Sequence, residues 1–190
     1  MRIHSSRFRD LFCRIRGSNV GRLAADERGA TIVEFAAVIT PLAALLVAIF
    51  QTSLLFFAQQ NLETTAEKAV RQIVTGQAQK AGMSKSQFKD LVCSKLPAFM
   101  KCQNVLIDVQ SAQSFSSITT GALPTTIKND GTVNDSYSFA PGGPGSVNIV
   151  RIMYVWDVQG GPLGFDLSTM SNKKRLLYAT SVFKTEPYTS

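Results

Sequence analysis

A long uncharged apolar run constrains this chain more than any other feature of its sequence. The 24 residues from Phe35 to Ala58 contain no charged side chain. A helix of that length rises roughly 36 Å, which is enough to cross a hydrocarbon core of about 30 Å with some tilt. A buried core helix is usually shorter and carries a polar face. We therefore expect a single transmembrane helix that spans about residues 35–58.

The charges on either side of this run predict its orientation in a membrane. Residues 1–29 hold seven arginines against three acidic residues, whereas Lys68 and Arg71 are the only basic residues at a comparable distance beyond the run. Basic residues concentrate on the cytoplasmic side of membrane spans. We expect a cytoplasmic N-terminus and a domain on the opposite side of the membrane. The net charge of +7 follows more simply from this basic leader than from nucleic-acid binding, and we expect no nucleic-acid partner.

The junction between the leader and the apolar run has the features of a processing site. A secretory signal would have a shorter apolar stretch, of about 7–15 residues. A cut after Gly29 would leave a new α-ammonium on Ala30, and Glu34 lies four residues further along the same helix face. The two charges could then neutralise each other, within one chain or between packed chains. The simpler alternative is that Glu34 is an acid at the membrane interface that complements the positive N-terminus of the helix.

Several segments together resemble one known family. They are Glu27–Ala36 with its Gly-Ala-Thr-Ile-Val-Glu-Phe stretch, Pro41, Gln59–Arg71 with Gln-Gln-Asn-Leu-Glu-Thr-Thr-Ala, and the closing Val182–Tyr188 with its Glu-Pro-aromatic order. This combination resembles the TadE-like family, which comprises pseudopilins, or minor pilins, of the bacterial tight-adherence (Flp-type) pilus system. The resemblance is closest over residues 27–71.

The resemblance implies a processing step and a set of partners. A prepilin peptidase of the aspartic-protease type would cut between Gly29 and Ala30, and Glu34 and Phe35 would form the assembly and processing motif. The mature protein would be a single-pass protein of the bacterial inner membrane. It would work with other pilins or pseudopilins and with the inner-membrane assembly platform. Whether it enters the surface pilus or stays in the membrane remains open.

Helix signals continue beyond the apolar run. Apolar residues recur at helical spacing up to Thr75, so we expect one long helix over residues 30–75 that Gly76 terminates. Ser84 and Gln87 form the pattern of a capping box, which predicts the start of a second helix. We expect Pro97 to end that helix.

Three strands and a long loop follow in the sequence. Alternating or continuous apolar residues predict strands over Val105–Val109, Val147–Val158 and Leu176–Thr185. We expect Asn172–Arg175 to form a solvated basic turn before the last strand. The Ser/Thr/Gly/Pro-rich residues 111–146 indicate a flexible loop.

These elements together predict an α+β fold. A single N-terminal transmembrane helix would extend into a long stalk helix and pack with a small antiparallel sheet in a periplasmic domain. The expected organisation is a cytoplasmic leader over residues 1–29, the transmembrane and stalk helix over residues 30–75, and the periplasmic domain over residues 76–190.

The predicted topology separates the three cysteines. Cys13 falls in the cytoplasmic leader, whereas Cys93 and Cys102 share the periplasmic side with eight residues between them. A disulfide between Cys93 and Cys102 is plausible in an oxidising compartment. A metal site or a thiol nucleophile is disfavoured because the single histidine, His4, lies in the leader. We expect no metal and no cofactor.

The sequence favours a structural protein over an enzyme. Asp108, Asp157 and Asp166 show no spacing that would pair them for acid–base work, and we expect each at a strand end or in a turn. Tyr154 and Trp156 are expected in the core or at an interface. We expect no catalytic activity and no small-molecule substrate.

Other functional classes stay open from the sequence. One is an uncleaved, membrane-anchored periplasmic domain that binds a partner. Another is a membrane-anchored periplasmic enzyme, which the missing histidines disfavour. A pseudopilin of type II secretion is a rival within the pilin class, and the long leader weighs against it.

Overall fold

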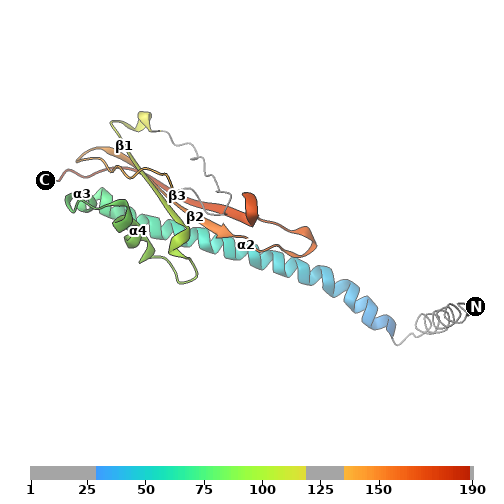
Figure 1. The fold of residues 1–190 in the computed structure, drawn as a ribbon. Coiled ribbons are helices and arrows are strands. Elements are labelled where there is room, and N and C mark those ends of the chain that lie inside the picture. The colour runs from blue at the N-terminus through green and yellow to red at the C-terminus, as the bar shows by residue number, and fades with distance from the viewer. Residues whose placement is uncertain (1–28, 119–134, 189–190) are drawn as a thin grey trace, which may run out of the picture. The chain divides into compact units, whose positions relative to one another are not determined.

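The computed structural model describes residues 29–118 and 135–188, in a chain that divides into two compact units, Met1–Val47 and Ala48–Ser190. The expectations for residues 1–28, Cys13 and His4 among them, lie outside the described residues. A long apolar helix and a three-stranded antiparallel sheet form the structure (Figure 1). This confirms the α+β fold class.

The helix α2 is the longest element and spans Ala30–Val74. It ends one residue before the predicted Thr75, and Gly76 adopts a left-handed backbone with φ of 73°, which glycine tolerates without steric cost. The single-turn helix α3, Gln77–Lys80, follows directly and was not predicted.

One face of α2 within the second unit is fully buried. The buried residues recur every three or four positions, which places them on one stripe of the helix; they are Leu55, Ala58, Leu62, Ala66, Ala69, Val70 and Ile73. Three of these are alanines, so the stripe mixes large and small apolar side chains. The stripe belongs to one apolar core with buried residues of all three strands.

The sheet follows the predicted antiparallel pairing with longer strands. It consists of β1 (Val105–Ala112), β2 (Val147–Asp157) and β3 (Lys174–Lys184) in that order. Ile152 of β2 lies opposite Ile107 of β1 and Ala179 of β3. β2 is the central strand, and its side chains from Val147 to Val155 are buried on both faces.

The expected basic turn at Asn172–Arg175 is only half correct. Asn172 and Lys173 have left-handed backbones and form a 3-10 turn, but Lys174 and Arg175 already belong to β3. Lys174 pairs with Asp157 across the end of the sheet at 2.8 Å. Cross-strand pairing therefore starts two residues earlier than the apolar pattern suggests, because an ion pair and not an apolar contact closes the hairpin.

The helix α4 spans Lys85–Cys93 and begins at the predicted capping box of Ser84 and Gln87. It ends four residues before Pro97, which corrects the expected boundary. The N–H groups of Lys95 and Leu96 bond to carbonyls three residues back, so the final turn tightens and the helix stops.

The second face of the sheet carries a buried ion pair that sequence analysis did not anticipate. Arg151 of β2 donates to the Asp108 carboxylate at 2.7 Å, and both side chains are buried. Asp108 also accepts from the Gln110 amide and from the N–H of Ser138. The expectation that Asp108 lies at a strand end or in a turn is therefore wrong.

Part of the predicted flexible loop, residues 111–146, is ordered against β1. Residues 111 and 112 belong to β1, and the bonds Val109 N–H to Ser138 O and Ala140 N–H to Val109 O, both 2.9 Å, extend the sheet edge. Asp108 holds the same segment through Ser138. Residues 119–134 of the predicted loop lie outside the described part.

The C-terminal segment closes the far end of α2. The N–H of Glu186 donates to the carbonyl of Val74 at 2.9 Å, which satisfies one of the free carbonyls at the helix end. The ring of Tyr188 lies directly against Gly76, where any Cβ would collide with it. The closing Glu-Pro-aromatic segment thus has a structural role as a cap.

Two ion pairs between directly opposite residues of neighbouring strands allow a matched stability test. Asp108–Arg151 is buried, whereas the carboxylate of Asp157–Lys174 is exposed. Asp108→Ala removes the buried carboxylate to which Arg151 donates, and we expect the free energy of unfolding to fall by about 3–5 kcal/mol. Asp157→Ala removes a pair whose carboxylate is 60% exposed, and we expect a loss below about 1 kcal/mol. Urea unfolding of the full chain in detergent, followed by Trp156 fluorescence, measures both. Equal losses would contradict the structural role of the buried pair.

Candidate functional site

The predicted processing junction lies at the start of α2. Gly29 is exposed and directly precedes Ala30, the first residue of the helix. A side chain at Gly29 would meet no atom within 4 Å. The described surroundings of the Gly29–Ala30 peptide bond therefore leave space for an enzyme that must bind an extended backbone.

Glu34 and Phe35 follow on the first turns of α2 and are exposed. Phe35 is 65% exposed. Glu34 makes no ion pair or hydrogen bond through its side chain to any residue that the structure describes. Neither side chain belongs to the apolar core. Both are therefore available for contacts other than core packing.

The apolar half of α2 presents large exposed side chains. Among the described residues, α2 is the one helix long and apolar enough to cross a membrane. The most exposed large apolar side chains of the first unit are Ile32, Val33, Phe35, Val38, Leu45 and Leu46. Exposed apolar surface on this scale is typical of contact with lipid or with other helices.

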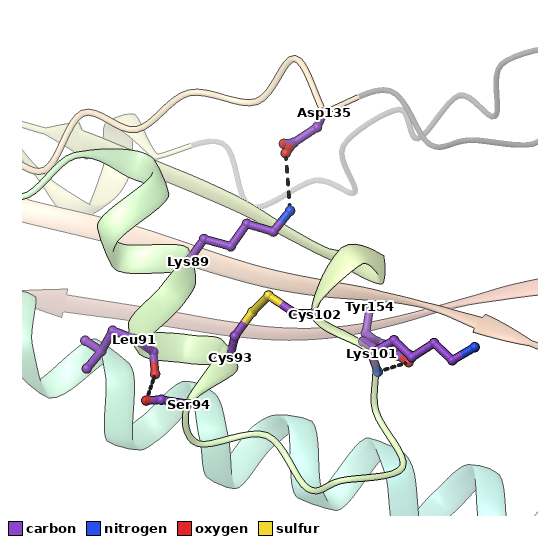
Figure 2. Close-up of a disulfide and its surroundings, with 8 residues drawn as sticks. All are labelled: Lys89, Leu91, Cys93, Ser94, Lys101, Cys102, Asp135 and Tyr154. Atoms are coloured by element: carbon purple, nitrogen blue, oxygen red, sulfur yellow. Dashed lines mark hydrogen bonds and ion pairs between the residues drawn. A yellow bond between two sulfur atoms is a disulfide. The ribbon is translucent and has the colours of Figure 1, made fainter.

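Cys93 and Cys102 form a disulfide, as predicted (Figure 2). Their Cα atoms lie 5.3 Å apart, within the usual range for such bonds. The bond joins the end of α4 to the turn that leads into β1. The N–H of Lys101, next to the second cysteine, donates to the Tyr154 hydroxyl at 2.9 Å, which fixes the same loop to β2.

The loop closed by the disulfide carries an aromatic cluster. Phe99 stacks on Phe57 of α2 with 5.6 Å between ring centroids and meets Trp156 edge-on at 6.4 Å. Trp156 in turn lies 6.2 Å from Tyr154. The expectation that Tyr154 and Trp156 belong to the core or to an interface is confirmed for Tyr154, which is buried, while Trp156 is half-buried at the edge of the core.

A groove of about 780 Å³ lies between α2 and the outer strand β3. Its polar lining includes Gln59, which bridges the two walls by donating to the carbonyl of Tyr178 at 3.0 Å and to the Glu63 carboxylate at 2.6 Å. Among the strands that the structure describes, β3 pairs with β2 alone, and its other edge borders the groove. The sequence did not predict the groove, because it depends on where β3 lies beside the helix.

The carboxylates considered for catalysis do not come together. Asp108 is buried on β1, Asp157 ends β2, and Asp166 lies in the β2–β3 connection. The N–H of Ser168 donates to Asp166 and lowers the pKa of that carboxyl below its ordinary value. Within the described residues no three metal-ligating side chains gather in a cluster.

Comparison with known proteins finds one family. The family model described as TadE-like protein matches residues 29–71. The chain carries a TadE-like segment. That segment begins at Gly29 and covers most of α2, up to the last turn. No curated protein and no solved structure matches the chain.

The TadE-like segment divides between the two halves of α2. Its N-terminal part holds the exposed Glu34 and Phe35, and its C-terminal part supplies most of the buried stripe, from Leu55 to Val70. The family match thus covers both the helix face that packs on the sheet and the exposed residues Glu34 and Phe35 at the start of α2.

The disulfide provides a stability test with a control in the same chain. Replacing both Cys93 and Cys102 by serine releases the loop between α4 and β1, and we expect a loss of about 2–4 kcal/mol in the free energy of unfolding. Cys13→Ser removes the remaining cysteine and should leave stability unchanged. Urea unfolding under non-reducing conditions measures the difference. An unchanged midpoint for the double variant would show that contacts such as Lys101–Tyr154 suffice to hold the loop.

Proposed function

We propose that this protein is a structural pilus-assembly protein, a pseudopilin of a tight-adherence (Flp-type) pilus. The observation that carries the proposal is the TadE-like segment, which opens at an exposed glycine directly before a long apolar helix. The folded second unit supports a structural role, because its core is apolar and its candidate carboxylates lie apart.

The proposed location is the bacterial inner membrane. The apolar half of α2 would cross the bilayer, with the arginine-rich leader, residues 1–29, in the cytoplasm. The domain that follows residue 75 would lie in the periplasm. The disulfide between Cys93 and Cys102 supports that side, because disulfides persist in oxidising compartments such as the periplasm.

The proposed maturation step is cleavage by a prepilin peptidase between Gly29 and Ala30. The step would leave a positively charged amine at the first residue of α2. Glu34 supplies an exposed carboxylate one helical turn away with no partner among the described residues. It would neutralise the amine of its own chain or of a neighbour during assembly, with Phe35 beside it as an apolar packing residue.

The proposed partners are other pilins or pseudopilins and the assembly platform in the inner membrane. Exposed apolar side chains around the N-terminal half of α2 are available for helix packing with such subunits. The function requires no cofactor and no small-molecule substrate, and we propose no enzymatic activity.

The role of Glu34 gives the sharpest test of this function. In Glu34→Ala the new amine would stay unpaired at an apolar interface. An unpaired charge there costs roughly 2.5–3.5 kcal/mol, and about 1.4 kcal/mol changes an equilibrium tenfold. We expect normal cleavage but more than about tenfold fewer pili, counted by electron microscopy of cells that express the variant.

A second glutamate on the same helix serves as the control. Glu67 is also exposed and also belongs to the TadE-like segment, but it lies in the second unit. Glu67→Ala should preserve both cleavage and pilus number. Wild-type pilus numbers in Glu34→Ala would contradict the assigned role, and loss of pili in both variants would point to a general effect of removing acid from α2.

A further inference from the structure

The connection between β2 and β3 packs on a part of α2 that belongs to the apolar run. Gln51 donates from its amide to the carbonyl of Gln159 at 3.4 Å. Phe165 lines a shallow hollow together with α2 residues from Ala48 to Phe56. Gly161 permits this approach, because a Cβ there would lie 2.9 Å from the Gln51 side-chain oxygen and from the Phe165 ring. Figure 1 shows the connection running alongside α2.

The position of these contacts along the helix matters because of the membrane thickness. A hydrocarbon core of about 30 Å takes about 20 helical residues. If the core begins at Phe35, its outer boundary falls near Leu54. The contacts of the β2–β3 connection, from Ala48 to Phe56, therefore lie at or just inside that boundary.

The tip of the connection has side chains and backbone suited to this depth. Leu163 is 82% exposed and adopts a left-handed backbone with φ of 56°, which is unusual for a bulky residue. The N–H of Gly161 donates to Phe165 O, and the N–H of Phe165 donates to Pro162 O. These two bonds satisfy part of the polar backbone at the tip, and Pro162 has no N–H group that would need a partner. A region poor in water requires such internal satisfaction of backbone groups.

A second exposed turn lies on the same part of α2. The turn Pro97–Met100 carries Phe99, which is 46% exposed and stacks on the exposed Phe57. Aromatic residues are enriched at the boundary between membrane and water. Lys95 and Lys101 are exposed beside the turn Pro97–Met100, and their charge complements the phosphates of lipid headgroups. Beside Pro162–Phe165, the exposed Lys173 is accompanied by the exposed carboxylates Asp157 and Asp166, so the fit of that turn to lipid rests on its apolar tip.

We propose that Pro162–Phe165, and Phe99 of the turn Pro97–Met100, insert into the boundary between headgroups and acyl chains of the bilayer that α2 crosses. This inference rests on the membrane anchorage in the proposed function. The occupant of the two turns is lipid because α2 carries them at the depth of the bilayer surface and because each presents an exposed apolar side chain, Leu163 or Phe99. The folded domain is thereby held against the membrane at two further points, about 5–10 Å deep in the interface.

A depth measurement on the full chain tests this contact. In a Cys13→Ser background, single cysteines at Leu163, Phe115 or Leu46 carry the fluorophore NBD, while the Cys93–Cys102 disulfide stays oxidised. Phe115 is the matched control, since it is an exposed apolar residue beyond the opposite end of the sheet. Leu46 reports the span itself. Each protein is placed in vesicles of phosphatidylethanolamine and phosphatidylglycerol that contain spin-labelled lipids.

The proposal expects a specific pattern of quenching. Labels near the headgroups should quench NBD at position 163 several times more strongly than at position 115, and labels deep in the acyl chains should quench NBD at position 46. Equal quenching at 163 and 115 would overturn the proposal. A blue-shifted but unquenched probe at 163 would also overturn it, because protein and not lipid would then cover the tip. An unquenched probe at 46 would instead remove the membrane anchorage, and the inference with it.

Discussion

The structure depends on the packing of one sheet against one stripe of one helix. The stripe runs from Leu55 to Ile73 and is made of leucine, isoleucine, valine and alanine. Side chains of this stripe and of all three strands share a single core. Burying this stripe orders about the last five turns of α2, and it gives a small sheet of three strands the apolar partner that it needs for stability.

Further contacts fix the rest of the second unit around this packing. The C-terminal residues close the end of α2 through Glu186 and Tyr188, and the disulfide fixes the loop that carries Phe99 onto Phe57. On the other face of the sheet, the Asp108–Arg151 pair satisfies two charges that burial would otherwise penalise. Every one of these contacts lies within the second unit, whereas the apolar side chains in the N-terminal half of α2 are exposed.

Much of this fold was predictable where a single local pattern decides the structure. The uncharged run predicted the long helix, Ser84 and Gln87 predicted the start of α4, and the alternation from Val147 predicted the central strand. Predictions failed where a contact between distant residues decides the outcome. Asp108 looks like a turn residue until Arg151, 43 positions away, pairs with it, and Lys174 joins β3 because Asp157 lies opposite.

The candidate site likewise contains residues that a local pattern identifies and features that depend on contacts between distant residues. Gly29, Ala30 and Glu34 could be selected from the sequence because their spacing suggests a cut and a charge pair, and Phe35 because the segment resembles the TadE-like family. The groove beside β3 and the turns at Phe99 and Leu163 could not, since they arise from where the sheet lies along α2. The part of the chain assigned to the span, residues 35–58, overlaps the part on which the β2–β3 connection packs, and only the structure reveals that overlap.

The central claim is that the chain is matured at the start of α2, and the N-terminal residue of the protein tests it most directly. Mass spectrometry of the terminal peptide, after extraction from membranes of cells that make the pilus, should find Ala30. Gly29→Leu should retain the leader, whereas Gly143→Leu, at an exposed glycine with equally open surroundings, should be cleaved normally. A terminus at Met1 in the wild-type protein would contradict the account and leave a membrane-anchored domain that binds a partner by another route.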